Sequence, residues 1–507
     1  MKKRALFSLY NTAKVEEFAE YLVQMGWEII ASRETVDILS RKGLSVIDIA
    51  DFTGVKEDYG FPPTFHPKVE LFLTSSDDNE KRIDLVYVIN YPLSKGNDVG
   101  GLTLLALAAK GKRIPITSVS DMKLVVDEIK ANGKISDELH LKLLNKTNAL
   151  ISSHYDDLIT EKMSYDAVFG TFKYGLRNGE NPYQSPASFF AAKGNDPLSL
   201  SNFKQLSGEQ PCFTNLADSD CIIQTISLAS EAFRLKYGKS PYICIAAKHG
   251  NPCGMAIDWD SPYVAVEKTL FGNPRAIWGG EVITNFTIDQ KIAELLFKSN
   301  ERERSIGSSS WMLDVILAPE FNREAVDILG INKIRKLFEN KALYSPFLIK
   351  AKWTYRFVRG GFLRQPPNNY VLNLEEAKFI GQELNNDMDS LIIAWVAAFS
   401  SNHGGNEVAL AKKSALISCG GAPSTVEAVQ HAVFKAEYLG HNAGDSVFAA
   451  DAFFPFIDAP ELLVKAGITA GLVPLGGKAI EKVMLFFKEN DVNMFYIPEI
   501  YRGFCRH

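Results

Sequence analysis

The sequence predicts an α/β protein with several domains, and three observations lead to this fold class. Short apolar runs typical of strands alternate with helical periodicity over the first 150 residues, which indicates a parallel sheet wound on both faces. The same alternation resumes after a charged stretch at residues 121–165. The length of 507 residues allows about three domains at roughly 100–200 residues each.

The first block alternates strands and helices that are joined by short turns. Its opening helix carries Phe18, Tyr21, Leu22 and Met25 on one face. The strands that we expect are residues 4–9, 27–32, 44–49, 84–89 and 114–118, and the helices are 12–25, 36–41 and 103–109. Residues 121–165 are rich in Lys, Asp, Glu and Asn, so we expect a helical connection there.

Two further α/β units follow, and a stretch rich in Gly and Pro at residues 360–369 predicts the break between them. The strands that we expect are residues 242–247, 281–284 and 314–318 in the second unit and 407–410, 415–418, 447–450 and 467–472 in the third. The third unit also contains an expected helix at residues 427–439. The predicted domains are therefore residues 1–150, 151–366 and 367–507.

Composition and charge exclude several classes of protein. The net charge of −5 gives no general attraction to nucleic acid or to anionic membranes. The chain has no run of 18 apolar residues, and its N-terminus lacks the apolar run and cleavage site of a signal peptide. The six cysteines form no C-x-x-C pair, which favours free thiols in a reducing compartment. We therefore expect a cytoplasmic protein.

The clearest candidate site is the segment AAKHGNPCG at residues 246–254. Lys248 and His249 follow a predicted buried strand, and ligands of open parallel sheets bind outside the carboxyl ends of strands. The pair is therefore a candidate for acid–base chemistry; the alternative is a surface lysine followed by a turn-capping histidine. The turn that we expect after the strand consists of Gly250, Asn251, Pro252 and Gly254.

Other patterns indicate ligand contacts less specifically. His249 and Cys253 are four residues apart, but no further Cys or His pair completes a ligand set nearby, so we expect no metal. Glycine pairs after strands expose backbone N–H groups to phosphate, although a plain turn is the commoner explanation. These pairs are Gly279-Gly280, Gly420-Gly421 and Gly476-Gly477. The segment DAFFPF at residues 451–456 fits either a slot for a planar ring or a small apolar cluster.

Taken together and in order, these segments resemble the bifunctional purine biosynthesis enzyme family, which joins 5-aminoimidazole-4-carboxamide ribonucleotide (AICAR) transformylase to inosine monophosphate (IMP) cyclohydrolase. The most specific matches are LRNGENPYQ at residues 176–184, KHGNPCG at 248–254, DVILAPEF at 314–321, DAFFPF at 451–456 and RGFCRH at 502–507. FHPKV at residues 65–69, NYP at 90–92 and DVGGLTLLALAAK at 98–110 also match.

The resemblance implies a methylglyoxal-synthase-like, doubly wound N-terminal domain followed by two deaminase-like α/β subdomains without zinc. The absence of H-x-E with P-C-x-x-C agrees with a deaminase-like unit that has no metal. The family also implies a homodimer with the transformylase site at the subunit interface. The implied ligands are a nucleotide and 10-formyltetrahydrofolate, the latter as co-substrate.

The resemblance assigns roles to individual residues of the transformylase half. His249 would remove the proton of the attacking amine, and Lys248 would place positive charge near the developing oxyanion. The family's catalytic Asn follows a Ser; the best alignment places it at Asn406, with two extra residues upstream. The residues implied to bind substrate are Arg177, Asn181, Gly279, Gly280, Asp314, Phe453 and Arg502.

The N-terminal domain departs from the family at its phosphate and catalytic motifs. The family's S-T-G-G-T is ASRET at residues 31–35, where Glu34 replaces a glycine and Arg33 compensates only in part. In R-V-K-T-L-H-P the Arg has become Phe61 and the Lys has become Pro63. The matching positions that remain are Thr64, His66, Tyr91, Asp98 and Lys110, with Asp98 beside Lys110 as an acid–base pair. We expect ring closure by this domain to be weak or absent.

The transformylase half has also changed. Asn178 replaces the family's Tyr, Tyr183 replaces a His, and Thr425 replaces an Arg. Loss of one charged partner costs about 1.5–3 kcal/mol, or roughly 10–100-fold in binding. The main hypothesis is a formyltransferase with a decayed cyclohydrolase. The alternatives are a fully bifunctional enzyme, a formyltransferase for another amine, and a non-catalytic nucleotide-binding homologue.

Overall fold

The computed structural model describes residues 2–55, 64–75, 82–159, 166–382 and 387–503. The chain divides into two compact units, Met1–Phe169 and Gly170–His507. The first boundary that we expected, at residue 150, falls inside helix α7 (Asp137–Asp156). Because this helix is continuous and packs on the first sheet through Leu139 and Leu143, its whole length belongs to the first unit.

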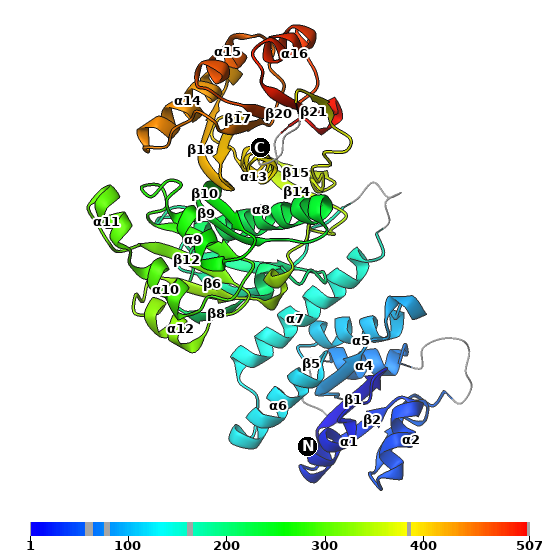
Figure 1. Cartoon of the computed structure of the whole chain (residues 1–507). Helices are drawn as coiled ribbons and strands as arrows, with labels where there is room; N and C mark the ends of the chain where they lie inside the picture. Colours follow the sequence, from blue (N-terminus) through cyan, green and yellow to red (C-terminus); the bar gives the residue numbers. More distant parts are fainter. Residues whose placement is uncertain (1, 56–63, 76–81, 160–165, 383–386, 504–507) are drawn as a thin grey trace. The chain divides into compact units, whose positions relative to one another are not determined.

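The first unit is a five-stranded parallel sheet with helices on both faces, as the alternating pattern predicted (Figure 1). The strand order is β3-β2-β1-β4-β5, with β1 (Arg4–Leu9), β2 (Glu28–Ala31), β3 (Val46–Asp48), β4 (Leu85–Ile89) and β5 (Ile114–Ile116). One face packs against α1 (Val15–Gln24), α2 (Arg33–Arg41), α6 (Val119–Asn132) and α7. The other face packs against α3 (Ile49–Thr53), α4 (Pro67–Thr74) and α5 (Val99–Lys110).

The second unit is built on one twelve-stranded mixed sheet that consists of two halves with the same pattern of strand directions. In spatial order the first half is β8 (Lys204–Ser207), β13 (Lys336–Glu339), β12 (Leu313–Ala318), β11 (Gly280–Thr284), β9 (Tyr242–Lys248) and β10 (Asn251–Asp258). The second half is β16 (Lys378–Ile380), β21 (Asn493–Ile497), β20 (Ala470–Pro474), β19 (Val447–Ala450), β17 (Asn406–Lys412) and β18 (Ala415–Ala422). In each half an antiparallel edge strand precedes three parallel strands, and an antiparallel hairpin completes the half.

Two long helices hold the halves together on one face of this sheet. α8 (Phe213–Tyr237) and α13 (Met388–Ser400) contribute to one apolar core that spans both halves. Every residue from Ser390 to Ser400 is buried, as expected for a helix that is apolar all round. The opposite face is covered by α9 (Pro262–Leu270), α10 (Gln290–Phe297) and α12 (Arg323–Leu329) in the first half and by α14 (Thr425–Tyr438), α15 (Asp458–Lys465) and α16 (Ile480–Glu489) in the second (Figure 1).

The predicted α/β class is confirmed, but one local prediction was wrong and some elements were not predicted. The Gly-Pro stretch at residues 360–369 contains a strand, because Gly360 (φ +82°) turns a hairpin between β14 (Thr354–Val358) and β15 (Gly361–Gln365). A second hairpin joins β6 (Gly170–Leu176) to β7 (Ala187–Ala192), and a short helix, α11 (Asn300–Ile306), lies in the first half. No helix among the described residues is long and apolar enough to cross a membrane.

Candidate functional site

The Lys248-His249 pair lies at the tip of a β-hairpin rather than at the end of a parallel strand. β9 runs antiparallel to both of its neighbours, β10 and β11, so the parallel-sheet argument does not apply. The turn is formed by His249 (φ 53°) and Gly250 (φ 70°), and left-handed backbone at both positions is typical of a two-residue hairpin turn. The predicted turn residues Asn251, Pro252 and Gly254 lie in β10, because Asn251 pairs with Lys248 across the ladder.

The hairpin borders a cavity of about 260 Å³ at the seam between the two halves. β10 and β18 pair at Ala256 and Ala415, and the Ile257 N–H donates to the Ser414 carbonyl at 3.0 Å. Farther along the same two strands, Cys253 and Cys419 border the cavity. Its lining residues are Lys248, His249, Asn251, Pro252, Cys253, Asn273, Ala276, His403, Ser418, Cys419, Lys435 and Leu439. Both halves of the unit therefore contribute to one site.

The glycine pair at the start of β11 positions the Lys248 ammonium group. Lys248 Nζ donates to the Gly279 carbonyl, and Gly279 has a left-handed φ of +67°. A Cβ on Gly279 would lie 2.9 Å from Lys248 Nζ, and one on Gly280 would lie 2.3 Å from the Ala247 carbonyl oxygen. These two glycines therefore allow a close approach of the backbone to the lysine strand.

A buried carboxyl group lies in the electrostatic field of Lys248. Glu281 on β11 is 2% exposed, and burial together with the charge of Asp218 raises its pKa well above the ordinary value, whereas Lys248 acts to lower it. Asp314 on β12, which we expected near a nucleotide, also raises the pKa of Glu281. Strongly shifted groups beside a cavity are typical of functional sites.

The structure adds a group that the sequence reasoning missed: His403, Glu407 and Cys419. Glu407 is fully buried on β17, and its Oε2 lies 2.8 Å from His403 Nδ1. Burial acts to lower the pKa of His403, but its contacts with Cys419 and Glu407 outweigh this effect and raise the pKa to about 9. A sequence signal for this group was the irregular spacing noted just upstream of Asn406, the stretch in which His403 lies.

Asn406 itself does not line this cavity in the part of the chain that the structure describes. Its Nδ2 donates to the carbonyl oxygens of Ala422 (3.2 Å) and Pro423 (2.8 Å) across the β17–β18 hairpin. Asn402, which follows a serine, lies closer to the lysine hairpin, because its backbone N–H donates to Asn251 Oδ1 at 2.7 Å. Gly420 and Gly421, expected after a strand, lie within β18.

Three segments noted separately in the sequence come together beside β19; they carry Phe453, the Gly476-Gly477 pair and Arg502. The Phe453 ring packs where Cβ atoms on Gly476 and Gly477 would stand, each 2.7 Å from a ring carbon, and the Arg502 guanidinium lies 5.5 Å from the ring centroid. Asp451 is 3% exposed and links this cluster to Glu407, because Asp451 Oδ1 accepts the backbone N–H of Glu407 at 2.8 Å. Burial raises the pKa of Asp451 to about 7. Residues 504–507 of the RGFCRH segment lie outside the described residues.

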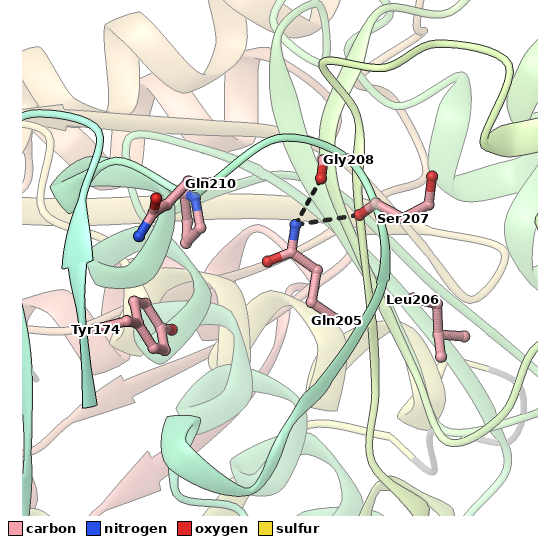
Figure 2. A pocket seen from close by; sticks show the side chains of 7 residues that line it. Tyr174, Gln205, Leu206, Ser207, Gly208 and Gln210 are labelled. Atoms are coloured by element: carbon pink, nitrogen blue, oxygen red, sulfur yellow. Dashed lines mark hydrogen bonds between the residues drawn. The ribbon is translucent and has the colours of Figure 1, made fainter. Parts of the chain in front are cut away.

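Arg177 and Asn181 lie in the β6–β7 connection, and neither lines the Lys248 cavity among the described residues. Arg177 pairs with Glu209, and Asn181 Nδ2 donates to Gln184 Oε1 at 3.0 Å. A second cavity, of about 430 Å³, lies near Arg177 and is lined by Tyr174, Gln205, Leu206, Ser207, Gly208, Gln210 and Pro211. Figure 2 shows Gln205 donating to the carbonyls of Ser207 and Gly208. This lining carries no ionised group, so the Lys248 cavity is better suited to acid–base chemistry.

The cyclohydrolase-like positions of the first unit are dispersed. Asp98 caps α5 by accepting from the Gly101 N–H, and Lys110 ends the same helix, so their backbones lie roughly 18 Å apart at 1.5 Å per residue. The expectation that Asp98 lies beside Lys110 was therefore wrong. Lys110 Nζ lies 3.7 Å from Glu70 instead.

The remaining predicted positions of this domain make local contacts. His66 Nδ1 caps α4, the Tyr91 hydroxyl donates to the Asn97 carbonyl, and Thr64 is buried. Arg33, expected to compensate in the phosphate loop, pairs with Asp48 at 3.2 Å. The substituted positions Phe61 and Pro63 lie outside the described residues.

Fold and site together define a two-unit α/β protein with a cavity that Lys248 and His249 line at the seam of a two-part mixed sheet. The family model "AICARFT/IMPCHase bienzyme" matches residues 109–435. Proteins described as "Bifunctional purine biosynthesis protein PurH" match almost end to end. The one from Caldicellulosiruptor saccharolyticus is 29% identical, with 100% of this chain and 99% of the relative covered.

The relative from Acetivibrio thermocellus is 31% identical, with 94% of this chain and 95% of the relative covered. The one from Bacillus cytotoxicus is 30% identical, with 98% of each chain covered. A solved structure titled "Crystal structure of ForH" is 26% identical over 31% of this chain and 95% of its own, with a TM-score of 0.28. The chain belongs to the AICARFT/IMPCHase bienzyme family of purine biosynthesis, as a divergent member.

Proposed function

We propose that the second unit transfers a formyl group from 10-formyltetrahydrofolate to the 5-amino group of AICAR. The observation that carries this proposal is the Lys248-His249 turn, which borders a cavity at the seam of the two halves. Membership of the AICARFT/IMPCHase family supplies the reaction class. The charges around the cavity support a reaction in which negative charge develops, because Lys435 lines the same cavity as Lys248.

The chemistry needs a base, a cation and a route for one proton. The amine of an aminoimidazole is a weak nucleophile, because its lone pair is delocalised into the ring. His249 takes the amine proton as the C–N bond forms at the formyl carbon, and the Lys248 ammonium stabilises the oxyanion. The bond to the folate nitrogen then breaks, and that nitrogen takes a proton. We assign Asn406, the position matched to the family's catalytic Asn, as a further donor to the oxyanion; in that role its Nδ2 would exchange the carbonyl oxygens of Ala422 and Pro423 for the substrate.

We assign nucleotide binding to the residues that match the substrate-binding positions of the family. Arg177 contacts the phosphate, Asp314 and the Gly279-Gly280 backbone approach the nucleotide, and Arg502 reaches it from the C-terminal segment. Asn181 and Phe453 complete the set. Arg177 and Asn181 lie away from the Lys248 cavity, which is consistent with a homodimer whose site uses residues of two chains.

We further propose that the first unit closes the IMP ring weakly or not at all. Two observations support this. Arg33, the nearest cation in the altered phosphate loop, pairs with Asp48, and Asp98 and Lys110 lie at opposite ends of α5. A phosphate would therefore meet Glu34 without a free compensating arginine.

The test follows tetrahydrofolate release by absorbance, with purified full-length protein, AICAR and 10-formyltetrahydrofolate. His249→Ala removes the proposed base, and His154→Ala, at a half-buried histidine of the first unit, is the matched control. Release that is lost only in His249→Ala supports formyl transfer, and accumulation of formyl-AICAR without IMP supports the decayed first unit. Absence of release from the wild type at high concentrations of both substrates would refute the transferase and favour another amine or a binding-only role.

A further inference from the structure

The seam cavity carries a second cluster of reactive side chains that formyl transfer does not use. It consists of His403, Glu407 and Cys419, which come from the loop after α13, from β17 and from β18. Their ligating atoms, an imidazole nitrogen, a carboxylate oxygen and a sulfur, all lie within 4.8 Å of one another. We propose that these three residues bind a Zn²⁺ ion at the wall of the Lys248 cavity.

The spacing of the three atoms fits a tetrahedral ion. Zinc binds nitrogen and oxygen at about 2.0–2.2 Å and sulfur at about 2.3 Å, which places neighbouring ligand atoms about 3.3–3.7 Å apart. Glu407 Oε2 lies 2.8 Å from His403 Nδ1 and 3.9 Å from Cys419 Sγ. These two distances fall on either side of the tetrahedral value, and an ion at this position would take the place of the His403–Glu407 hydrogen bond.

Neighbouring groups already orient the carboxylate and the thiol. Glu407 Oε1 accepts the backbone N–H groups of His403 and Gly404, which leaves Oε2 facing the histidine and the cysteine. The Cys419 thiol lies 3.4 Å from Ser401 Oγ. Outer contacts of this kind fix the direction of ligands in metal sites. Glu407 is fully buried and Cys419 is 5% exposed, so water competes little for either group.

The ligand types and the charges select the metal. A thiolate with an imidazole favours zinc over magnesium or calcium, which prefer oxygen ligands alone. Carboxylate and thiolate carry two negative charges, which equal the charge of the ion. The loaded site therefore adds no net positive charge beside Lys248 and Lys435, which line the same cavity.

A set of three protein ligands leaves one zinc position open. His403 and Cys419 both line the cavity, so the open position is accessible from the side that carries Lys248 and His249. The ligand class for this position is an oxygen donor, such as water, a carboxylate or a carbonyl oxygen. Zinc binding does not depend on the proposed formyl transfer.

The experiment titrates full-length, chelator-dialysed protein with Zn²⁺ in a calorimeter. We expect one equivalent per chain, and an affinity lowered by more than about 10-fold in His403→Gln and in Cys419→Ser. Cys253→Ser is the matched control, because Cys253 borders the same cavity while its thiol contacts the Ala246 carbonyl. Its zinc affinity should equal that of the wild type.

Because Cys419 is buried, its replacement can unfold the chain. A second measurement therefore uses the wild-type protein. Co²⁺ in place of Zn²⁺ gives a thiolate-to-cobalt charge-transfer band only when a cysteine sulfur is a ligand. We expect this band in the wild type and in Cys253→Ser. Absence of stoichiometric zinc, absence of the cobalt band in the wild type, or full zinc affinity in a folded Cys419→Ser protein would each overturn the proposal.

Discussion

Replacement of Gly279 by alanine tests whether the glycine turn positions the Lys248 ammonium group. Gly279 has a φ of +67°, and an alanine in left-handed backbone costs roughly 1–2 kcal/mol of folding free energy. The new methyl group would lie 2.9 Å from Lys248 Nζ, which is closer than a carbon and an ammonium nitrogen tolerate. Because Lys248 is a flexible side chain, the ammonium group moves away and its contact with the Gly279 carbonyl is lost.

Gly238→Ala is the matched control for the backbone cost. Gly238 ends helix α8 with a φ of +74°, and a Cβ there would meet nothing within 4 Å. Both variants should therefore lose a similar 1–2 kcal/mol in urea unfolding. A displacement of about 1 Å at a reacting group costs on the order of 100-fold in rate, so only Gly279→Ala should lose formyl transfer by about that factor.

The assay measures tetrahydrofolate release at saturating AICAR, together with urea unfolding of each variant. Gly279→Ala should combine the modest stability loss of Gly238→Ala with a far larger fall in kcat. Equal rates for the two alanine variants would refute the positioning role of Gly279. A rate loss in both, in proportion to unfolding, would show that only stability had changed.

Three further predictions concern the second unit. The pKa of Asp451 rises in the folded chain from the ordinary 3.8 to about 7, so its contribution to stability is complete below about pH 4 and is lost as pH rises to 7. Urea unfolding at pH 4 and 7.5 should therefore show a smaller decline for Asp451→Asn than for the wild type; parallel declines would contradict this. Arg335→Met should lose about 3 kcal/mol or more in urea unfolding, because the buried guanidinium donates to three backbone carbonyls, and an unchanged midpoint would exclude this role. Asn406→Ala should lower kcat for formyl transfer by about 10-fold or more if Asn406 is the oxyanion donor; a comparable loss in Asn402→Ala alone would transfer that role.

The sequence by itself determined the features that depend on local pattern. Apolar strand runs and the helical face with Phe18 and Leu22 predicted the doubly wound first sheet, because strand and helix periodicities are visible within one element. The Lys248-His249 pair was found by its motif; Lys248 ends a strand, as expected, and Gly250 belongs to the turn that follows. Short motifs in a fixed order were sufficient to identify the family, and the comparisons with known proteins confirm that identification.

Tertiary structure alone decided which distant residues meet. Asn251 and Gly254 read locally as turn residues, but pairing with β9 draws them into a strand, since ladder hydrogen bonds outweigh local preference. Asp98 and Lys110 match one continuous motif, yet helix α5 separates them by its length.

The cluster of His403, Glu407 and Cys419 forms because the β17–β18 hairpin places its strands side by side, and no local pattern records that pairing. Phe453 and Arg502, 49 residues apart in the printed sequence, meet because parallel strands β19, β20 and β21 end at the same edge of the sheet. Local propensity specifies each element, whereas the site depends on contacts whose energy exists only after the chain has folded.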